Sequence, residues 1–223
     1  MWVVRIFTRG DENMQARTIM TIVMSILFLS TIAFAESATD FLKAKHEEMK
    51  VIVKENKPDD AIREDLRLKM DTFFDYDTLG KKTIEADWDK QKTEDQKRFI
   101  ELFKKMIQKS YLKKFKPRTD YTIEFTKEES KEGVIIVYAT IVYKDSEADV
   151  EYWMHKKDKG FFVWDVVVDE SSLMRTYRKK FDKVIQKDGF AKLLEKMDKT
   201  VQKGDENEDK DEDEGTEKDD KEG

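Results

Sequence analysis

The sequence contains no cysteine, and its 223 residues include only two histidines, His46 and His155. Without cysteine the chain can form no disulfide framework, thiolate zinc site, iron–sulfur cluster or thiol nucleophile. A lipid-modified N-terminal cysteine is excluded for the same reason. The eight glycines are scattered, so the sequence has no glycine-rich phosphate-binding loop. Most familiar catalytic and cofactor sites are therefore excluded.

Charged residues make up 41% of the chain, far above the usual share of roughly 25%. They are unevenly placed, because residues 203–223 hold 12 acidic residues against 4 lysines and no apolar residue. Such a segment cannot bury surface, so we expect a disordered acidic tail. The body, residues 36–202, is nearly neutral and long enough for a single domain with one core. This charge balance argues against a nucleic-acid partner.

A short apolar run, IMTIVMSILFLSTIAF, follows the basic residue Arg17 and ends in Ala33-Phe34-Ala35. A basic flank, a short apolar stretch and an A-x-A end are typical of a secretory signal peptide. The run of about 16 residues is shorter than the ~20 that a spanning helix needs, although an uncleaved anchor is the alternative. We expect residues 1–35 to be a signal peptide, and Met14 is a candidate for the true start.

Helical spacing dominates the first half of the body. Apolar residues recur at steps typical of a helix over residues 41–53 and again over 62–73, where Pro58 precedes the second stretch. Thr93 and Gln96 form a capping-box pattern that opens the longest predicted helix, and Pro117 ends it. The apolar face of this helix is unusually aromatic.

The centre of the body changes to strand patterns. The sequence predicts strands over residues 121–127, 134–143, 149–155 and 161–169, at the spacing of hairpins. Two of them are apolar on both sides, so we expect both sheet faces to be covered. Helical spacing then returns on either side of Gly189. This order predicts an α+β fold, in which an antiparallel four-stranded meander packs with helices from both ends of the chain and encloses an apolar cavity.

Asp165 is the main candidate for catalysis, because it lies within an otherwise apolar strand. A buried carboxylate there can have a raised pKa and act as a base. The simpler interpretation is structural, with an ion pair or hydrogen bond to a neighbouring element that offers Arg175 and Arg178. Large aromatic side chains from several elements form either ordinary core or the wall of a cavity, and composition does not separate these two interpretations.

Three stretches occur in an order that points to a family. They are FFDYDTLGKKTIEADW (73–88), KTEDQKRFIELFKKMIQKSYLKKF (92–115) and FFVWDVVVDESSLMRTYRKKFDKVIQKDGFAKLLEKM (161–197). Together they resemble the MlaC family of periplasmic phospholipid-binding proteins, also called toluene-tolerance or ABC-transporter auxiliary proteins. The chain departs from the usual pattern of this family at two places. Ile84 and Glu85 stand where family members usually have a Leu-Gly pair, and Glu170 stands where they tend to have a glycine.

The resemblance implies a soluble periplasmic carrier without enzymatic activity, cofactor or metal. Such a carrier binds phospholipid acyl chains and shuttles lipid between an outer-membrane lipoprotein complex and an inner-membrane ABC transporter complex, which maintains outer-membrane lipid asymmetry. One alternative is a carrier of the same family for a hopanoid or another hydrophobic ligand. The others are an α+β cone enzyme with Asp165 as its base and an interaction protein with a filled core.

We expect the acyl chains to lie between the aromatic face of the long helix, one face of the meander and a stripe of the following helix. On the last strand we choose alternate residues, because successive side chains of a strand point to opposite faces. The predicted lipid-binding residues are Phe103, Ile107, Tyr111, Tyr138, Trp164, Val166, Val168, Leu173, Tyr177 and Phe181.

Overall fold

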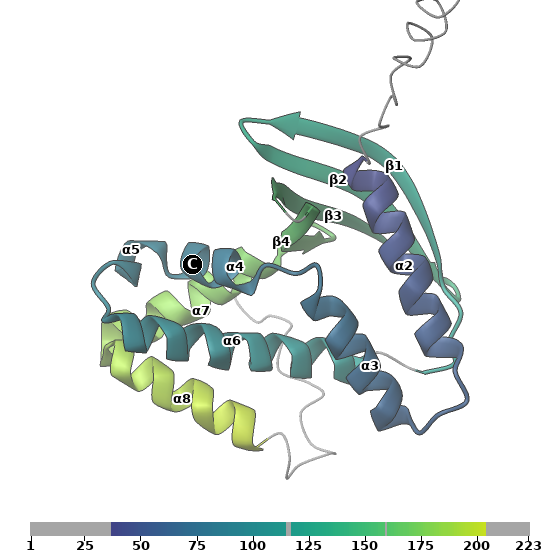
Figure 1. The fold of residues 1–223 in the computed structure, drawn as a ribbon. Coiled ribbons are helices and arrows are strands. Elements are labelled where there is room, and N and C mark those ends of the chain that lie inside the picture. Colours follow the sequence, from purple (N-terminus) through teal and green to yellow (C-terminus); the bar gives the residue numbers. More distant parts are fainter. Residues whose placement is uncertain (1–36, 115–116, 159, 204–223) are drawn as a thin grey trace, which may run out of the picture. The chain divides into compact units, whose positions relative to one another are not determined.

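The computed structural model describes residues 37–114, 117–158 and 160–203. The predicted signal peptide and residues 204–223 of the predicted acidic tail lie outside this part of the chain. Helices come first, then a strand meander, then two more helices (Figure 1). The elements are α2 (Ala38–Lys54), α3 (Asp59–Asp71), α4 (Tyr76–Thr83), α5 (Glu85–Trp88), α6 (Thr93–Lys114), β1 (Thr122–Lys131), β2 (Val134–Tyr143), β3 (Ser146–Lys157), β4 (Gly160–Val168), β5 (Ser171–Ser172), α7 (Leu173–Asp188) and α8 (Phe190–Lys203).

Local capping explains where several helices begin and end. The side chain of Ser37 accepts a hydrogen bond from the backbone N–H of Asp40 at the start of α2, and Ser172 does the same for Arg175 at the start of α7. Pro58 directly precedes α3, and its φ of −54°, fixed by the proline ring, favours the start of a helix. Gly189 ends α7 with φ +85°, a conformation that glycine adopts without strain. The predicted helices correspond to α2, α3, α6, α7 and α8 and are confirmed, whereas α4 and α5 were not predicted.

The sheet is an antiparallel meander in the order β1-β2-β3-β4-β5. The prediction of four strands is correct for the long ones, but β5 adds a fifth that pairs Ser171 and Ser172 with the end of β4. Two polar serines show no apolar alternation, so no sequence pattern marked this strand. The residues before it, Asp169 and Glu170, make the connecting turn with φ +45° and +66°.

The first hairpin is longer than the sequence predicted. We expected a turn over residues 128–133, but β1 continues to Lys131 and the turn contains only Glu132 and Gly133. Both turn residues have positive φ, which suits a tight two-residue hairpin. The charged residues of β1 form a strand because they lie at the edge of the sheet, where water solvates their side chains.

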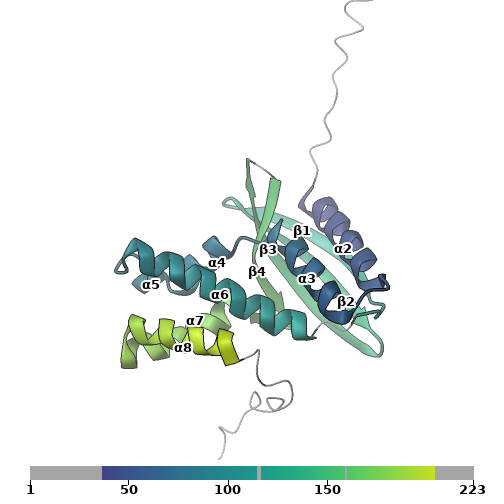
Figure 2. The same cartoon turned by 60° about the horizontal axis from the view of Figure 1, so that its bottom comes forward.

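Cross-strand pairing divides the sheet into two faces, because residues directly opposite one another share a face. We call the inner face the one that contains Phe125, Ile135, Val137, Ala139, Val150, Tyr152, Met154, Phe161, Val163 and Val166. The outer face contains Ile136, Tyr138, Val142, Trp153 and Phe162. Helix α2 contacts β1 and β2 and lies along the sheet (Figures 1 and 2). The outer-face residues are only partly buried, and Val142 is 37% exposed, so the expectation that both faces are covered is wrong for this part of the outer face.

The inner face and the helices share one hydrophobic core cluster. Met154 of the sheet and Phe103 of α6 are both fully buried members of it. Gly80 lets α4 approach α6 closely, since a Cβ there would lie 2.3 Å from Cδ1 of Ile100. A smaller cluster around Ile62 joins α2 and α3 to the end of α6. Within the described ranges, none of the helices combines the length and the apolar character needed to cross a membrane.

Candidate functional site

The aromatic face of α6 meets the predicted stripe of α7. The ring of Phe103 lies 4.9 Å from that of Tyr177 and 5.3 Å from that of Phe181, measured between centroids. Phe99, one turn earlier on α6, also contacts Phe181 at 5.7 Å. Both helices present these residues at a spacing of four, which aligns them on one face. The structure therefore brings three of the predicted site residues into direct contact.

Two further predicted residues extend this aromatic cluster. Ile107 on α6 and Leu173 at the start of α7 are buried and belong to the same core cluster. Tyr111 lies one helical turn beyond Ile107 on α6, but its side chain lies outside the described part of the structure. The helical half of the predicted site is thus assembled from α6 and α7.

A bulge in β4 divides the strand residues that we expected to share one face. Trp153 pairs with Asp165 and Met154 with Val163, so Trp164 is an extra residue between them. Val166 pairs with Tyr152 on the inner face and packs against the core. The ring of Trp164 instead lies 5.7 Å from that of the outer-face residue Trp153. Alternate residues share a face only in a regular strand, so our placement of Trp164 with Val166 is wrong.

Two further predicted strand residues are not buried. Tyr138 is on the outer face, where its hydroxyl donates a hydrogen bond of 3.0 Å to the carboxylate of Glu129. Val168 pairs with Val150 and so shares the inner face with Val166, but at the end of β4 its side chain is 39% exposed. The strand β2 is apolar on both sides, so its sequence did not show which alternate set faces the core.

Sequence reasoning missed four other residues of the inner face. Val137, Val150, Met154 and Val163 come from three strands and are all buried. The register places them on one face, because Met154 pairs with Val163, and Val137 and Val150 pair with the inner-face residues Tyr152 and Ala139. Only this register identifies them as one surface.

His46 of α2 inserts a polar group into the interior. Its Nε2 lies 2.9 Å from the hydroxyl of Tyr152, and its Nδ1 lies 3.3 Å from that of Tyr121. The pKa of His46 is lowered to about 4, mainly because the ring is buried and also because the positive charge of Lys50 lies nearby. Burial also raises the pKa of Tyr152. All three groups are therefore neutral near pH 7. The spacing of Leu42 and His46 on one helical stripe was the available signal.

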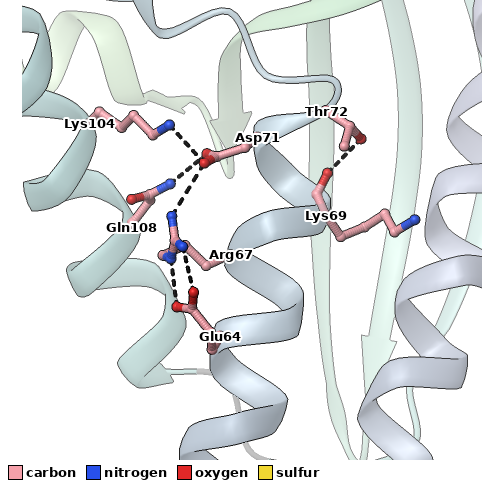
Figure 3. Close-up of polar contacts among 7 residues, drawn as sticks. All are labelled: Glu64, Arg67, Lys69, Asp71, Thr72, Lys104 and Gln108. Carbon is pink, nitrogen blue, oxygen red and sulfur yellow. Dashed lines mark hydrogen bonds and ion pairs between the residues drawn. The ribbon is translucent and has the colours of Figure 1, made fainter.

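Asp71, the last residue of α3, connects α3 to α6 (Figure 3). Its carboxylate accepts hydrogen bonds from Lys104 at 2.7 Å and from Gln108 at 2.6 Å, both on α6. Arg67, one turn earlier on α3, contacts the same carboxylate at 3.4 Å and also binds Glu64. The two positive charges are thus balanced by two carboxylates. This network holds the helices together and leaves no excess charge for an ionic ligand.

Asp165 is bound by the first turn of α7. Its carboxylate accepts hydrogen bonds from the Ser172 hydroxyl at 2.7 Å and from the backbone N–H groups of Met174 and Val166, each at 2.9 Å. Burial raises the pKa of Asp165, and these hydrogen bonds oppose that effect. The expected hydrogen-bonding role is confirmed. The expected arginine hydrogen bonds are not formed, because Arg175 donates to the backbone carbonyl of Glu170, and Arg178 donates to the carbonyl of Lys82 in α4 and to the carboxylate of Glu85 in α5.

A second buried carboxylate, Asp75, caps α4. It accepts from the backbone N–H of Thr78 at 3.0 Å and from the Thr78 hydroxyl at 2.7 Å. Lys157 also donates to it, and Nε2 of His155 lies 2.8 Å away. Burial alone would raise the pKa of Asp75, but the hydrogen bonds from Lys157 and Thr78 lower it. Among the described residues, no group of three or more His, Asp and Glu side chains is arranged to hold a metal ion.

The family model described as MlaC protein matches residues 43–199 of the chain. The chain belongs to the MlaC family. The matched range runs from α2 into α8, so the whole meander and the aromatic cluster belong to the MlaC region.

A solved structure shares this MlaC fold. It is that of the phospholipid-binding protein from Ralstonia solanacearum in complex with a phospholipid, with a TM-score of 0.67 and 17% sequence identity. The alignment covers 74% of this chain and 97% of that chain. At this identity the likeness establishes the fold. No curated protein sequence matches the chain.

Proposed function

We propose that the chain is a periplasmic carrier that binds phospholipid by its acyl chains, between the inner face of the sheet and the aromatic cluster of α6 and α7. Membership of the MlaC family is the observation that carries this proposal. The fold shared with a phospholipid-binding protein supports it.

The interior has the apolar surfaces that such a ligand needs. Acyl chains with about 30 methylenes gain more than 20 kcal/mol gross on leaving water, at roughly 0.8 kcal/mol each. The inner sheet face and the aromatic cluster contribute to one apolar core from two layers, so separating them slightly would present hydrocarbon surface on both sides. We propose that Phe103, Tyr177 and Phe181 form one wall and that Val166 and its inner-face neighbours form the other.

The electrostatics of this interior also suit hydrocarbon. The histidine between α2 and the sheet is neutral near pH 7, and its tyrosine partners are neutral as well. A neutral, hydrogen-bonded polar group costs far less to bury than a charge does. The zwitterionic or anionic head group would then stay in solvent while the acyl chains enter.

We further propose that the carrier exchanges lipid with an outer-membrane lipoprotein complex and an inner-membrane ABC transporter complex, and so maintains lipid asymmetry. Family membership supports this role. Exchange must be reversible, so the large gross transfer energy has to be nearly balanced by the cost of opening and filling the interior.

Organic extraction of the purified mature chain, followed by mass spectrometry, tests the proposal. We expect diacyl phospholipid to co-purify at a fixed ratio to protein. A polycyclic lipid such as a hopanoid would support the alternative cargo, and an empty extract from folded, periplasmically expressed protein would contradict lipid carriage.

A matched pair of variants tests where the acyl chains lie. Val166→Glu places a carboxylate on the inner face, whereas Val142→Glu makes the same change on the outer face, where the side chain is 37% exposed. We expect the first variant to lose lipid and the second to keep it, with circular dichroism as the check on folding. If Val166→Glu does not fold, Val166→Trp tests the same space without a charge. Normal loading of a folded inner-face variant would refute the assigned location.

A further inference from the structure

His46 and the hydroxyls of Tyr121 and Tyr152 contain one more hydrogen-bond donor than the two contacts between them use. A neutral imidazole has one N–H and one lone pair, and a tyrosine hydroxyl both donates and accepts. His46 is neutral near pH 7, so it donates to one of these tyrosines and accepts from the other. Whichever tyrosine accepts from the imidazole keeps its own O–H for another acceptor. We call these three residues the polar trio.

The tautomer of His46 decides where the extra donor lies. With the proton on Nδ1, the imidazole donates to Tyr121, and the Tyr152 hydroxyl donates to Nε2 across 2.9 Å. With the proton on Nε2, the imidazole donates to Tyr152, and the O–H of Tyr152 becomes free to donate elsewhere. Neither tautomer carries a charge, so the donor can move to Tyr152 without the cost of burying an ion.

Tyr152 holds this donor beside the proposed lipid-binding interior. Its side chain is 8% exposed, and among the residues that the structure describes its hydroxyl forms a hydrogen bond only with Nε2 of His46. Tyr152 pairs with Val166 in the sheet, the residue that we place in one wall of the lipid site. A buried donor without an acceptor is unfavourable. An uncharged acceptor on the ligand would therefore draw the O–H of Tyr152 towards itself.

The polar trio runs from the surface into the interior. Tyr121, just before β1, is only partly buried, and Nζ of Lys50 lies 5.6 Å from the centroid of its ring. Lys50 also pairs with Glu47 at 2.8 Å. His46 is 7% exposed and lies between the two tyrosines, on helix α2, which runs along the sheet (Figures 1 and 2). Charged groups thus mark the solvent end of the trio, and Tyr152 marks its apolar end.

A phospholipid presents its groups in a matching order. The head group is charged, the tails are hydrocarbon, and the acyl ester carbonyls lie between them. An ester carbonyl is an uncharged acceptor, so it can enter an apolar interior at low cost if a donor meets it there. An ether-linked lipid with the same head group and the same tails has no carbonyl at this depth.

We propose that Tyr152, with His46 in its Nε2–H tautomer, donates a hydrogen bond to an acyl ester carbonyl of the bound lipid. This inference rests on the proposed function and adds the class of cargo, because ester-linked lipids are then preferred to ether-linked ones. His46 is a positioning residue, since it acts on the ligand through the hydroxyl of Tyr152.

A competition between two lipids that differ only in their carbonyls tests the preference. The delipidated mature chain is mixed with vesicles that contain equal amounts of dioleoyl phosphatidylglycerol and its dioleyl ether analogue, and the lipid on the re-isolated protein is measured by mass spectrometry. We expect the ester lipid to be enriched about fivefold, the usual net contribution of one hydrogen bond. Equal uptake of the two lipids would overturn this inference and leave the proposed function intact. Uptake of neither lipid would contradict the proposed function itself, and this inference with it.

Two variants that each lose one hydroxyl locate the donor. Tyr152→Phe should take up the two lipids equally, because it keeps the ring and removes the O–H. Tyr138→Phe makes the same change on the outer face, where the hydroxyl binds Glu129, and should keep the native preference. Circular dichroism and uptake of the ether lipid check that both variants fold. A native preference in folded Tyr152→Phe would overturn the inference.

The tautomer of His46 gives a measurement on the native chain that does not depend on a variant of Tyr152. Nitrogen-15 NMR of the ring distinguishes Nε2–H from Nδ1–H, and the only other histidine of the chain, His155, is assigned with a His155→Gln variant. In protein loaded with the ester lipid, we expect His46 to carry its proton on Nε2. A proton on Nδ1 in the loaded protein would overturn the inference, because Tyr152 would then donate to His46 and not to the lipid.

Discussion

The buried histidine should make the protein sensitive to mild acid. His46 is 7% exposed and has a pKa of about 4, against 6.5 for a solvated histidine. Between these values the unfolded chain binds a proton that the folded chain excludes, so stability falls as the pH falls from 6.5 towards 4. Above pH 6.5 both states are neutral and the effect is absent.

The magnitude follows from the shift. A difference of about 2.5 pKa units corresponds to roughly 3 kcal/mol once both states are protonated, at 1.36 kcal/mol per unit. At pH 4.5 most of this loss, about 2.5 kcal/mol, should already be present. Such a loss is a large share of the 5–15 kcal/mol that is typical of a domain.

Urea unfolding at pH 7 and at pH 4.5 measures the effect, with His46→Gln as the matched variant. Glutamine keeps hydrogen-bonding groups near the hydroxyls of Tyr121 and Tyr152 but does not titrate. Burial lowers the pKa of His155 as well, so both proteins should lose some stability in acid. The native chain should lose about 2.5 kcal/mol more than the variant does.

Two results would refute this reasoning. One is an equal loss of stability in the native chain and in His46→Gln. The other is a titration of His46, followed by its ring resonances in NMR spectra, with a midpoint near that of a free histidine. Either result would mean that water reaches the space between α2 and the sheet.

Other side chains give simpler predictions. Phe103→Ala should cost about 3–5 kcal/mol, measured by urea unfolding, because Phe103 is fully buried among aromatic rings. Asp165→Asn should cost about 1–3 kcal/mol and leave lipid loading unchanged, and an unaltered stability would contradict its structural role. Glu170→Gly should raise the free energy of unfolding by about 0.5–1 kcal/mol, and with it the melting temperature, because Glu170 has φ +66°, which glycine adopts without strain. A lower melting temperature would show that this side chain contributes contacts that outweigh the strain.

The sequence by itself determined the longer helices, the four long strands and their order, but not the short elements α4, α5 and β5. Periodicity of 3.6 and of 2 marked the helices and the long strands, and the stripe through Phe103 on α6 and Tyr177 and Phe181 on α7 was readable because residues four apart in a helix share a face. Short local signals, such as Pro58 before α3 and Gly189 after α7, marked helix boundaries because they act within a few residues.

Tertiary structure alone decided which strand residues face the core. β2 is apolar on both sides and β4 contains a bulge at Trp164, so alternation could not separate Val166 from Tyr138 and Trp164. The partners of His46 and Asp71 likewise come from elements distant in the sequence. Register, bulges and long-range hydrogen bonds arise when strands and helices meet, so a local pattern of residue types does not predict them.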